Sequence, residues 1–481
     1  MTSRHAGSDE AAAKALVRAR MAAARGEDEA AKQGYLETLR RDPACLDALI
    51  ELGALAYASG HRSAARTAYA EAVRQHPGNP ISHIGLANIM LGDGDACGAR
   101  HHCEAALAAA PDFPEAHQAL ARALSELGDA SAETHWQKGF SGHAVTARRY
   151  RGAGPAVPLL LLVAARGGNI ATRQWIDDRT FAVTAVYTDF FDPGAPLPPH
   201  ALVVNAIADA DLCGVALERA EHLLARNAAP VINPPRLVRA TGRAGTAQRL
   251  SGIPGVIAPA TMTLPRDSVL EASALGFPLL LRTPGFHTGQ NFVLAETRGA
   301  LAGAAAGLPG RELLAIEYLN ARGADGLARK YRVMFIGGVM YPLHLAIAPG
   351  WKVHYYTAAM ADSAAHREEE RRFLDGMPDV LGGRAMSALT GISAALGLDY
   401  AGVDFALSPE GSVLLFEANA AMVVNPPAPD EMWAYRRPAI TNVLDAAKRM
   451  LLDRASSELP HLPKSTSGGS TVVGDVVKMS S

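Results

Sequence analysis

The pattern of apolar and polar positions predicts an open α/β fold for the middle of the chain. The unbroken apolar run from Val157 to Ala165 has the length of a parallel strand buried on both faces, and it is too short to cross a membrane. The same reading predicts three later strands and two helices: strands at 181–187, 201–206 and 230–233, and helices from 211 to 227 and from near Thr172. Strands that alternate with helices form a parallel sheet with right-handed crossovers.

Polar residues follow two of these predicted strands. Gly167 and Gly168 come directly after the first strand, where they either form a tight turn or let the backbone approach an anion at a helix N-terminus. Asn205, Asp209 and Asp211 follow the third strand, at the sheet edge where α/β proteins bind ligands. These three residues are candidates for substrate contact, or they cap the next helix.

A regular repeat runs through the first third of the chain. Pro43, Pro77 and Pro111 are evenly spaced, and Tyr35, Tyr69 and Cys103 recur with the same period. The pattern resembles the tetratricopeptide repeat, in which small residues let two helices approach, an aromatic ring fills the gap and proline ends the second helix. It predicts an all-α solenoid over residues 1–145, with repeats at 12–45, 46–79, 80–113 and 114–140.

Stacked helix pairs typically form a concave surface that binds a peptide or a partner protein. The resemblance therefore implies a peptide, protein or carrier-bound substrate as the partner of residues 1–145. The alternative is that the array only packs against its neighbouring domain or dimerises. From frequency alone, a homodimer is the oligomer that we expect.

Near the other end of the chain, two strands with alternating patterns present oxygen ligands. Asp404 lies on the first strand, and Glu417 and Asn419 lie two positions apart on the second, so that both point to the same face. Two carboxylates and an amide oxygen suit Mg²⁺, which prefers a few such ligands together with nucleotide phosphates. The alternative is a β-hairpin with a polar face.

The order of motifs before this acidic pair resembles that of ATP-grasp ligases, the superfamily of glutathione synthetase and D-alanine–D-alanine ligase. The resemblance covers about residues 155–450. It includes the segment 230–235 leading to Thr241-Gly242-Arg243, the strand that ends at Arg282, and the strand Lys330-Tyr331-Arg332-Val333. It implies a multidomain chain in which the solenoid is followed by an α/β pre-ATP-grasp domain at 150–240 and an α+β ATP-grasp domain at 241–453.

The resemblance also implies roles for individual residues. Arg243 and Arg282 would hold nucleotide phosphates, Arg332 would face the reacting carboxylate, and the metal ligands would be Asp404, Glu417 and Asn419. A loop containing His287, Thr288 and Gly289 would close over ATP, and the backbone of Glu317, Tyr318 and Leu319 would pair with adenine. The cofactors implied are ATP and Mg²⁺, or Mn²⁺ in its place.

This chain departs from the superfamily at two positions. Where those enzymes usually carry lysines that contact the nucleotide, this chain has Arg243 and Arg282. Arginine stays charged and grips phosphate with two parallel hydrogen bonds, so nucleotide binding is still expected. The change also keeps open a second interpretation, a non-catalytic nucleotide-binding scaffold or sensor that binds a protein through its repeats.

Further polar side chains follow Arg332 on apolar strands. If the chain reverses at Gly337-Gly338, Arg332 and His344 reach the same pocket. Lys352 and His354 are two positions apart and would share one face of a strand. His344 and Lys352 are candidate catalytic residues beside Arg332, and the alternative for either histidine is a buried ring satisfied by hydrogen bonds.

Composition narrows the class of protein. The chain has 481 residues, enough for about three domains, and its net charge of −2 favours neither nucleic acid nor a membrane surface as a partner. Its four cysteines form no CxxC pair, which is typical of reduced thiols in the cytoplasm. The N-terminus does not resemble a secretion signal, and the Ser/Gly-rich residues 454–481 resemble a flexible tail.

Together these features predict an ATP-dependent ligase that forms an amide or peptide bond through an acyl phosphate. The acid would be activated by ATP, and a small-molecule amine or amino acid would then displace phosphate. A third interpretation is an enzyme that phosphorylates its acceptor without forming an amide. The identities of the acid and the amine do not follow from the residues.

Overall fold

The computed structural model describes residues 2–284, 291–353, 358–427 and 430–456. The chain divides into two compact units, Met1–Ala153 and Gly154–Ser481. Each unit has its own architecture, and each is described by itself below.

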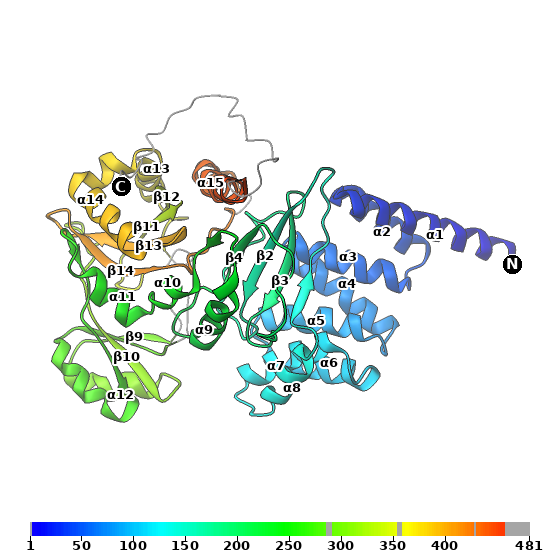
Figure 1. Ribbon diagram of the computed structural model, residues 1–481, viewed down its shortest axis with the longest axis horizontal. Coiled ribbons are helices and arrows are strands. Elements are labelled where there is room, and N and C mark those ends of the chain that lie inside the picture. The colour runs from blue at the N-terminus through cyan, green and yellow to red at the C-terminus, as the bar shows by residue number, and fades with distance from the viewer. Residues whose placement is uncertain (1, 285–290, 354–357, 428–429, 457–481) are drawn as a thin grey trace. The chain divides into compact units, whose positions relative to one another are not determined.

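In its described residues the first unit is an all-α array of four helix pairs, followed by the short strand β1 (Val145–Ala147) (Figure 1). The pairs are α1 (Thr2–Arg25) with α2 (Asp28–Arg41), α3 (Leu46–Ala58) with α4 (Arg62–Gln75), α5 (Pro80–Gly92) with α6 (Ala96–Ala109), and α7 (Pro114–Glu126) with α8 (Ala132–Phe140). Helices α3, α5 and α7 each begin one period after the last, so the predicted all-α repeat region is confirmed. Helix α1 begins at Thr2, earlier than the predicted start of the first repeat at residue 12.

Glycine and tyrosine set the spacing inside this array. The Tyr69 ring packs between α3 and α5, and a Cβ atom added at Gly85 would lie 2.4 Å from one of its ring carbons. At Gly53 the same ring would be 3.0 Å away. The helices therefore approach because these two positions lack a side chain, as the repeat pattern predicts.

The second unit begins with a parallel α/β sheet. Its strands run in the order β3-β2-β4-β5, and all neighbours are parallel. The strands are β2 (Val157–Val163), β3 (Phe181–Tyr187), β4 (Leu202–Asn205) and β5 (Val231–Ile232), and the helical segments are α9 (Gly214–Leu223), η1 (Leu224–Arg226) and α10 (Pro235–Arg239). The predicted strands are confirmed, each within two positions at either end.

The predicted helix near Thr172 is wrong. The segment forms hydrogen-bonded turns instead, in which the Thr172 carbonyl accepts from the backbone N–H groups of Trp175 and Ile176. Both residues are buried, and the Trp175 ring stacks on Tyr400 at a centroid distance of 4.9 Å. A tertiary contact with a distant strand therefore decides this local conformation, which is why local periodicity did not show it.

Two further sheets follow. A four-stranded antiparallel sheet has the order β7-β10-β8-β9, and a mixed five-stranded sheet has the order β12-β11-β13-β14-β6. The first contains β7 (Thr261–Pro265), β8 (Leu279–Arg282), β9 (Phe292–Ala295) and β10 (Glu312–Glu317). The second contains β6 (Val256–Ile257), β11 (Ala328–Ile336), β12 (Val339–Ala348), β13 (Tyr400–Leu407) and β14 (Val413–Asn419).

Helices cover these sheets (Figure 1). Against the four-stranded sheet pack η2 (Arg266–Leu275) and α12 (Leu301–Ala306), and η3 (Arg298–Ala300) lies beside α12. Against the five-stranded sheet pack α11 (Arg243–Leu250), α13 (Ala364–Asp375), α14 (Met377–Leu396) and α15 (Arg437–Ser456), the last preceded by η4 (Glu431–Arg436).

Helix α15 continues to Ser456, past the predicted end of the folded region at 453. Leu451 and Ala455 are fully buried, and their spacing keeps one apolar face on the helix. Residues 457–481 of the predicted tail lie outside the described part of the chain.

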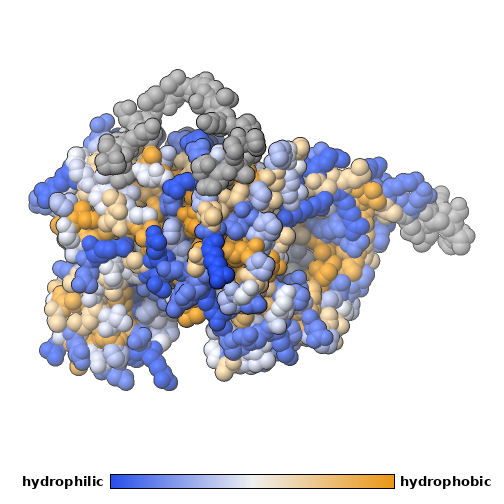
Figure 2. All heavy atoms as spheres, viewed as in Figure 1, coloured by the Kyte–Doolittle hydropathy of each residue, from blue (hydrophilic) through white to orange (hydrophobic). Residues whose placement is uncertain are grey.

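On the face shown in Figure 2, hydrophilic residues are interspersed with small hydrophobic patches. Among the described residues, none of the helices is both long enough and apolar enough to cross a membrane.

Candidate functional site

A cavity of about 570 Å³ in the second unit is lined by residues that lie on, or directly after, strands of all three of its sheets. This volume lies in the range of small-molecule binding sites. Every predicted site residue within the described ranges lines it: Arg243, Arg282, Glu317, Tyr318, Leu319, Arg332, His344, Lys352, Asp404, Glu417 and Asn419. The predicted residues His287, Thr288 and Gly289, and the neighbouring His354, lie outside the described residues.

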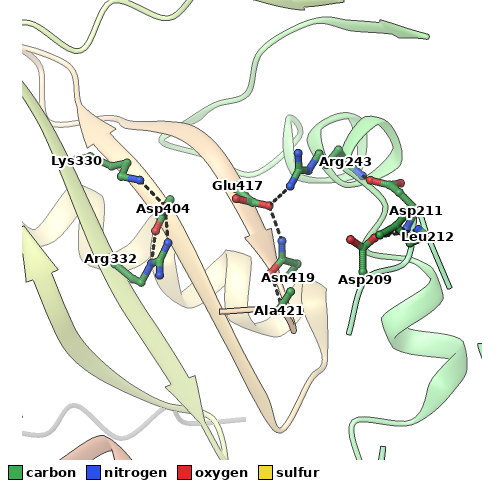
Figure 3. A network of polar contacts seen from close by, with 10 residues as sticks. All are labelled: Asp209, Asp211, Leu212, Arg243, Lys330, Arg332, Asp404, Glu417, Asn419 and Ala421. Carbon is green, nitrogen blue, oxygen red and sulfur yellow. Dashed lines mark hydrogen bonds and ion pairs between the residues drawn. The ribbon is translucent and has the colours of Figure 1, made fainter. Parts of the chain in front are cut away.

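A carboxylate held by two cations forms one end of the site (Figure 3). Asp404 on β13 lies directly opposite Arg332 on β11. Arg332 donates from Nε to Oδ1 at 2.5 Å and from Nη2 to Oδ2 at 2.8 Å, and Lys330 donates from Nζ to Oδ2 at 2.9 Å. Because Lys330 lies two positions before Arg332 on the same strand, both side chains project to the same face.

The electrostatics of this cluster favour the charged forms of Asp404 and Arg332. Burial alone would raise the pKa of Asp404, but Arg332 and Lys330 outweigh it and hold that pKa far below its usual range. Burial alone would lower the pKa of Arg332, and the Asp404 carboxylate more than offsets it. The carboxylate side chain is 4% exposed, so the ion pair is screened little by water.

His344 joins the same cluster through the β11–β12 hairpin. The chain reverses at Gly337 and Gly338, and the register places His344 opposite Arg332, next to an irregularity in the ladder. The predicted convergence of the two residues is therefore confirmed. Burial, and then the charge of Arg332, lower the pKa of His344 well below its usual value, so its imidazole is neutral at pH 7.

A second ion pair lies beside the first, because Glu417 on β14 is the register partner of Asp404 on β13. Arg243, at the start of α11, donates from Nη2 to Glu417 Oε1 at 2.8 Å, and Asn419 donates from Nδ2 to the same oxygen at 2.9 Å (Figure 3). The amide oxygen of Asn419 accepts from the backbone N–H of Ala421 at 2.8 Å. Burial alone would raise the pKa of Glu417, but Arg243 contributes to a net lowering.

Arg282 lies at the end of β8, beside an aromatic contact between the two sheets. Its guanidinium is 5.4 Å from the centre of the Phe292 ring, and Phe292 meets Trp351 edge-on at a centroid distance of 5.3 Å. Phe292 belongs to the four-stranded sheet and Trp351 follows the last strand of the hairpin in the other. Burial, with a smaller effect of Arg243, lowers the pKa of Arg282 to about 10, so it remains a cation at pH 7.

The predicted nucleobase segment ends β10. The Glu317 N–H donates to the Ala260 carbonyl at 2.8 Å, and the Glu317 carboxylate accepts from the Ala260 N–H at 2.9 Å. Tyr318 and Leu319 follow at the wall of the cavity. Lys352 is exposed and lies after the end of β12, so its predicted place on a strand is wrong, because that strand stops at Ala348.

The α/β sheet contributes an acidic edge. Asp209 accepts from the backbone N–H groups of Asp211 and Leu212, and Asp211 accepts from the backbone N–H of Arg243 at 3.3 Å (Figure 3). Burial raises the pKa of Asp211. The Gly168 carbonyl accepts from the N–H groups of Ala208 and Asp209, with a φ of 73° at Gly168. The glycine pair therefore makes a tight turn, and its second member also lines the cavity.

The predicted metal ligands differ in how well they fit a metal ion. Glu417 and Asn419 are hard oxygen donors on one strand, of the kind that Mg²⁺ takes. Both carboxylate oxygens of Asp404 are already bonded to cationic side chains. Within the described ranges, no group of three or more His, Cys, Asp and Glu side chains is arranged to hold a metal, and the predicted set contains only two such residues.

Sequence reasoning did not single out Lys330. The signal was present, because Lys330 precedes Arg332 by two positions on an alternating strand. Its role depends on the register that brings Asp404, far along the chain from Lys330, opposite that strand.

Comparison with known proteins matches only part of the chain. No family model matches it, and no curated protein does either. Among solved structures, MamA is 18% identical, and the match covers 27% of this chain and 77% of that chain at a TM-score of 0.26. A tetratricopeptide repeat protein from Parabacteroides merdae ATCC 43184 is also 18% identical, with 28% and 54% covered and a TM-score of 0.26. YrrB, described as a TPR protein with an unusual peptide-binding site, is 18% identical, with 27% and 69% covered and a TM-score of 0.25.

Proposed function

We propose that the second unit is an ATP-grasp ligase that joins a carboxylate to an amine, and that the first unit recruits a peptide, protein or carrier-bound substrate. One observation carries the catalytic part. A single cavity in the second unit collects five basic side chains and four carboxylates from segments far apart in the sequence. The basic residues are Arg243, Arg282, Lys330, Arg332 and Lys352, and the carboxylates belong to Asp209, Glu317, Asp404 and Glu417.

The distribution of charge supports a polyphosphate ligand. Arg243 and Arg282 lie close enough that each affects the other's electrostatic environment. Two guanidinium groups on one wall match the geometry and charge of nucleotide phosphates. The Glu317–Leu319 segment would bind the base through its backbone. These groups would hold ATP with its γ-phosphate directed toward the end of the cavity formed by Arg332.

The reaction follows from that placement. An oxygen of the substrate carboxylate attacks the γ-phosphorus, the bond from that phosphorus to the β-γ bridging oxygen breaks, and ADP leaves with the electron pair. The amine then attacks the acyl carbon, and phosphate leaves as the carbon–oxygen bond breaks. Arg332 would stabilise the charge that develops on the acyl oxygen, and the departing phosphate can take up the proton that the amine gives up.

A divalent cation would be held at the Glu417–Asn419 end of the cavity, with Asp404 the third member of the predicted set. When bound, Mg²⁺ or Mn²⁺ supplies charge neutralisation for the β- and γ-phosphates. The protein's own contribution is to position the reactants and to exclude water from the acyl phosphate.

The role of the repeats rests on their architecture. Helix pairs repeated at a constant interval form an array of the kind that presents a continuous binding surface. Deleting residues 1–153 tests recruitment, because they form a compact unit of their own. Recruitment predicts a higher KM for a macromolecular substrate with an unchanged kcat, whereas equal turnover by both chains contradicts it.

A second function is favoured by one specific observation. The cations and carboxylates of the cavity are bonded to each other, as Arg243 with Glu417 and Arg332 with Asp404 show. A scaffold that binds nucleotide without turning it over would have the same arrangement. In that case the repeats would bind a protein partner, and the presence or absence of bound nucleotide would signal the state of the complex.

Calorimetry with ATP and Mg²⁺, followed by assays of ADP and phosphate release against pooled amino acids and peptides, tests these functions. A ligase binds ATP and releases ADP and phosphate in equal amounts when acid and amine are both present, and Glu417→Ala abolishes release. Binding without release in any pool favours the scaffold. ADP release without phosphate indicates transfer of the phosphoryl group to a stable acceptor. No ATP binding refutes the proposed function.

A further inference from the structure

The residues that follow the last helix of the first unit run back along the array. Helix α8 ends at Phe140 in the fourth helix pair, and β1 and then residues 148–151 follow it. Arg149 lines a cavity of about 470 Å³ together with side chains of α1, α2 and α3. Arg151 Nη1 lies 3.5 Å from Asp28 Oδ1 at the start of α2. The segment 148–151 therefore lies on the first two helix pairs, although it is joined to the fourth.

The helices of the array build the other walls of this cavity, from the side chains of Arg20, Ala23, Tyr35, Glu51, Ala54 and Leu55. Glu51 Oε1 accepts from Arg20 Nε at 2.8 Å and from Arg20 Nη2 at 2.6 Å. Arg20 Nη2 also donates to Asp47 at 2.7 Å. Burial, and then a hydrogen bond to Glu51, raise the pKa of Tyr35, and the nearby charge of Arg149 opposes that rise. The Arg149 guanidinium therefore lies within electrostatic reach of a carboxylate and a tyrosine that the repeats hold in place.

The charges of the segment and of the array are complementary. The array contributes three carboxylates and one guanidinium to this surface, those of Asp28, Asp47, Glu51 and Arg20. The neighbouring Arg25 and Glu27 pair with each other and add no net charge. Three negative charges against one positive charge leave about −2, and the two arginines of the segment that contact the array offset it. The surface is thus suited to a basic peptide rather than to an acidic one.

We propose that the surface of α1 and α3 around Glu51 binds an extended basic peptide with two arginines two positions apart, and that residues 148–151 occupy this surface until such a partner replaces them. The inference names the partner class for the recruitment role proposed above, and it rests on that role for the delivery of substrate. The Arg151 and Asp28 side chains are 27% and 51% exposed. Ion pairs at exposed positions contribute little, so a partner can displace the segment.

Tethering explains how such weak contacts keep the surface occupied. A short flexible linker holds a segment near its site at an effective concentration of about 1 mM. A surface with a dissociation constant of about 0.1 mM for the free segment would then be occupied in about nine of ten chains. A competing peptide would bind about tenfold more weakly to the occupied chain than to an open one, because only the open fraction is competent to bind.

Fluorescence anisotropy of a labelled peptide with the sequence of residues 147–152 tests the inference in the full chain. Arg149→Ser/Arg151→Ser weakens the hold of the chain's own segment, and we expect the peptide to bind this variant about tenfold more tightly than the unmodified chain. Adding Glu51→Gln to the double variant should weaken peptide binding about tenfold, the usual effect of losing a charged hydrogen bond. Arg371→Ser removes an arginine from an exposed pair on α13 and should behave as the unmodified chain does.

Equal peptide affinities for the unmodified chain and the double variant overturn the inference. So does a peptide that binds the double variant equally well when serine replaces the arginines equivalent to Arg149 and Arg151, and this comparison requires no further change to the protein. A double variant that binds a second copy of the chain, and not the peptide, assigns the surface to contacts between copies and also overturns the inference. Peptide binding without ADP release in any substrate pool supports the inference and refutes the proposed ligase, so the two failures are distinguishable.

Discussion

Arg332 and Asp404 face each other across the β11–β13 pair, with Nε 2.5 Å from Oδ1 and Nη2 2.8 Å from Oδ2. This two-point contact fixes the plane of the guanidinium at the wall of the cavity. Because Lys330 shares the same carboxylate, the three side chains behave as one unit.

Replacing Asp404 with asparagine should destabilise the second unit strongly. The change removes the carboxylate to which two largely buried cations are bonded, and breaking such a pair costs about 3–5 kcal/mol. Urea denaturation of the full chain, followed by tryptophan fluorescence, measures this loss. Asp325→Asn is the matched control because Asp325 pairs with Arg329 at an exposed site. Equal decreases of the urea midpoint in the two variants would contradict a special role for the buried cluster.

Replacing Arg282 with alanine should weaken ATP binding about ten- to a hundredfold, the usual effect of losing a charged hydrogen bond. Arg282→Lys keeps a positive charge at this position, so it should keep most of the affinity. Calorimetry with ATP and Mg²⁺ measures the ATP affinity of both variants. Arg371→Ala removes an arginine from an exposed pair on α13 and should leave the affinity unchanged. An ATP affinity that is unchanged by Arg282→Ala would show that this residue does not bind the nucleotide.

Gly85→Ala should lower the melting temperature of the first unit. The new methyl group would lie 2.4 Å from the Tyr69 ring, which is itself buried between helices. Overpacking of this kind costs about 1–3 kcal/mol, which outweighs the higher helix propensity of alanine. Gly78→Ala is the control, because a Cβ there meets nothing within 4 Å. A melting temperature unchanged by Gly85→Ala would mean that the helices shift freely.

Histidine pairs should make the stability of the first unit depend on pH. His83 donates from Nε2 to the Pro77 carbonyl and lies 2.9 Å from His102 between Nδ1 atoms, and the pair of His117 and His135 repeats this arrangement at 2.8 Å. Burial lowers the pKa of His102 and of His135. The unfolded chain, whose histidines titrate at about 6.5, therefore binds more protons as the pH falls. Stability should be complete above about pH 6.5 and decline below it.

The chain itself provides a control for this pH dependence. One repeat earlier, the positions of His83 and His102 hold Leu49 and Ala68. The double variant His83→Leu/His102→Ala should lose part of the decline in urea midpoint between pH 7 and 5 relative to the unmodified chain. Identical pH profiles for the two proteins would show that other groups cause the decline.

Several features of the site followed from local patterns. The turn at Gly337-Gly338 placed His344 near Arg332, and alternation placed Glu417 and Asn419 on one face of β14. The role of Lys330 did not follow from local patterns, because its partner Asp404 lies on a strand far along the chain. Trp175 illustrates the opposite case, in which a residue expected in a helix is held in a turn by stacking on Tyr400.

The sequence by itself determined the repeat array and the identity of most strands, because both follow from patterns of apolar and polar residues that are local in the chain. The constant period sets helix, turn and packing together within each repeat. Only the tertiary structure decided which charges meet. Arg243 pairs with Glu417 and Arg332 with Asp404 across long stretches of chain, so their pairing depends on strand order and register. A shift of one position would turn each of those strand side chains to the opposite face.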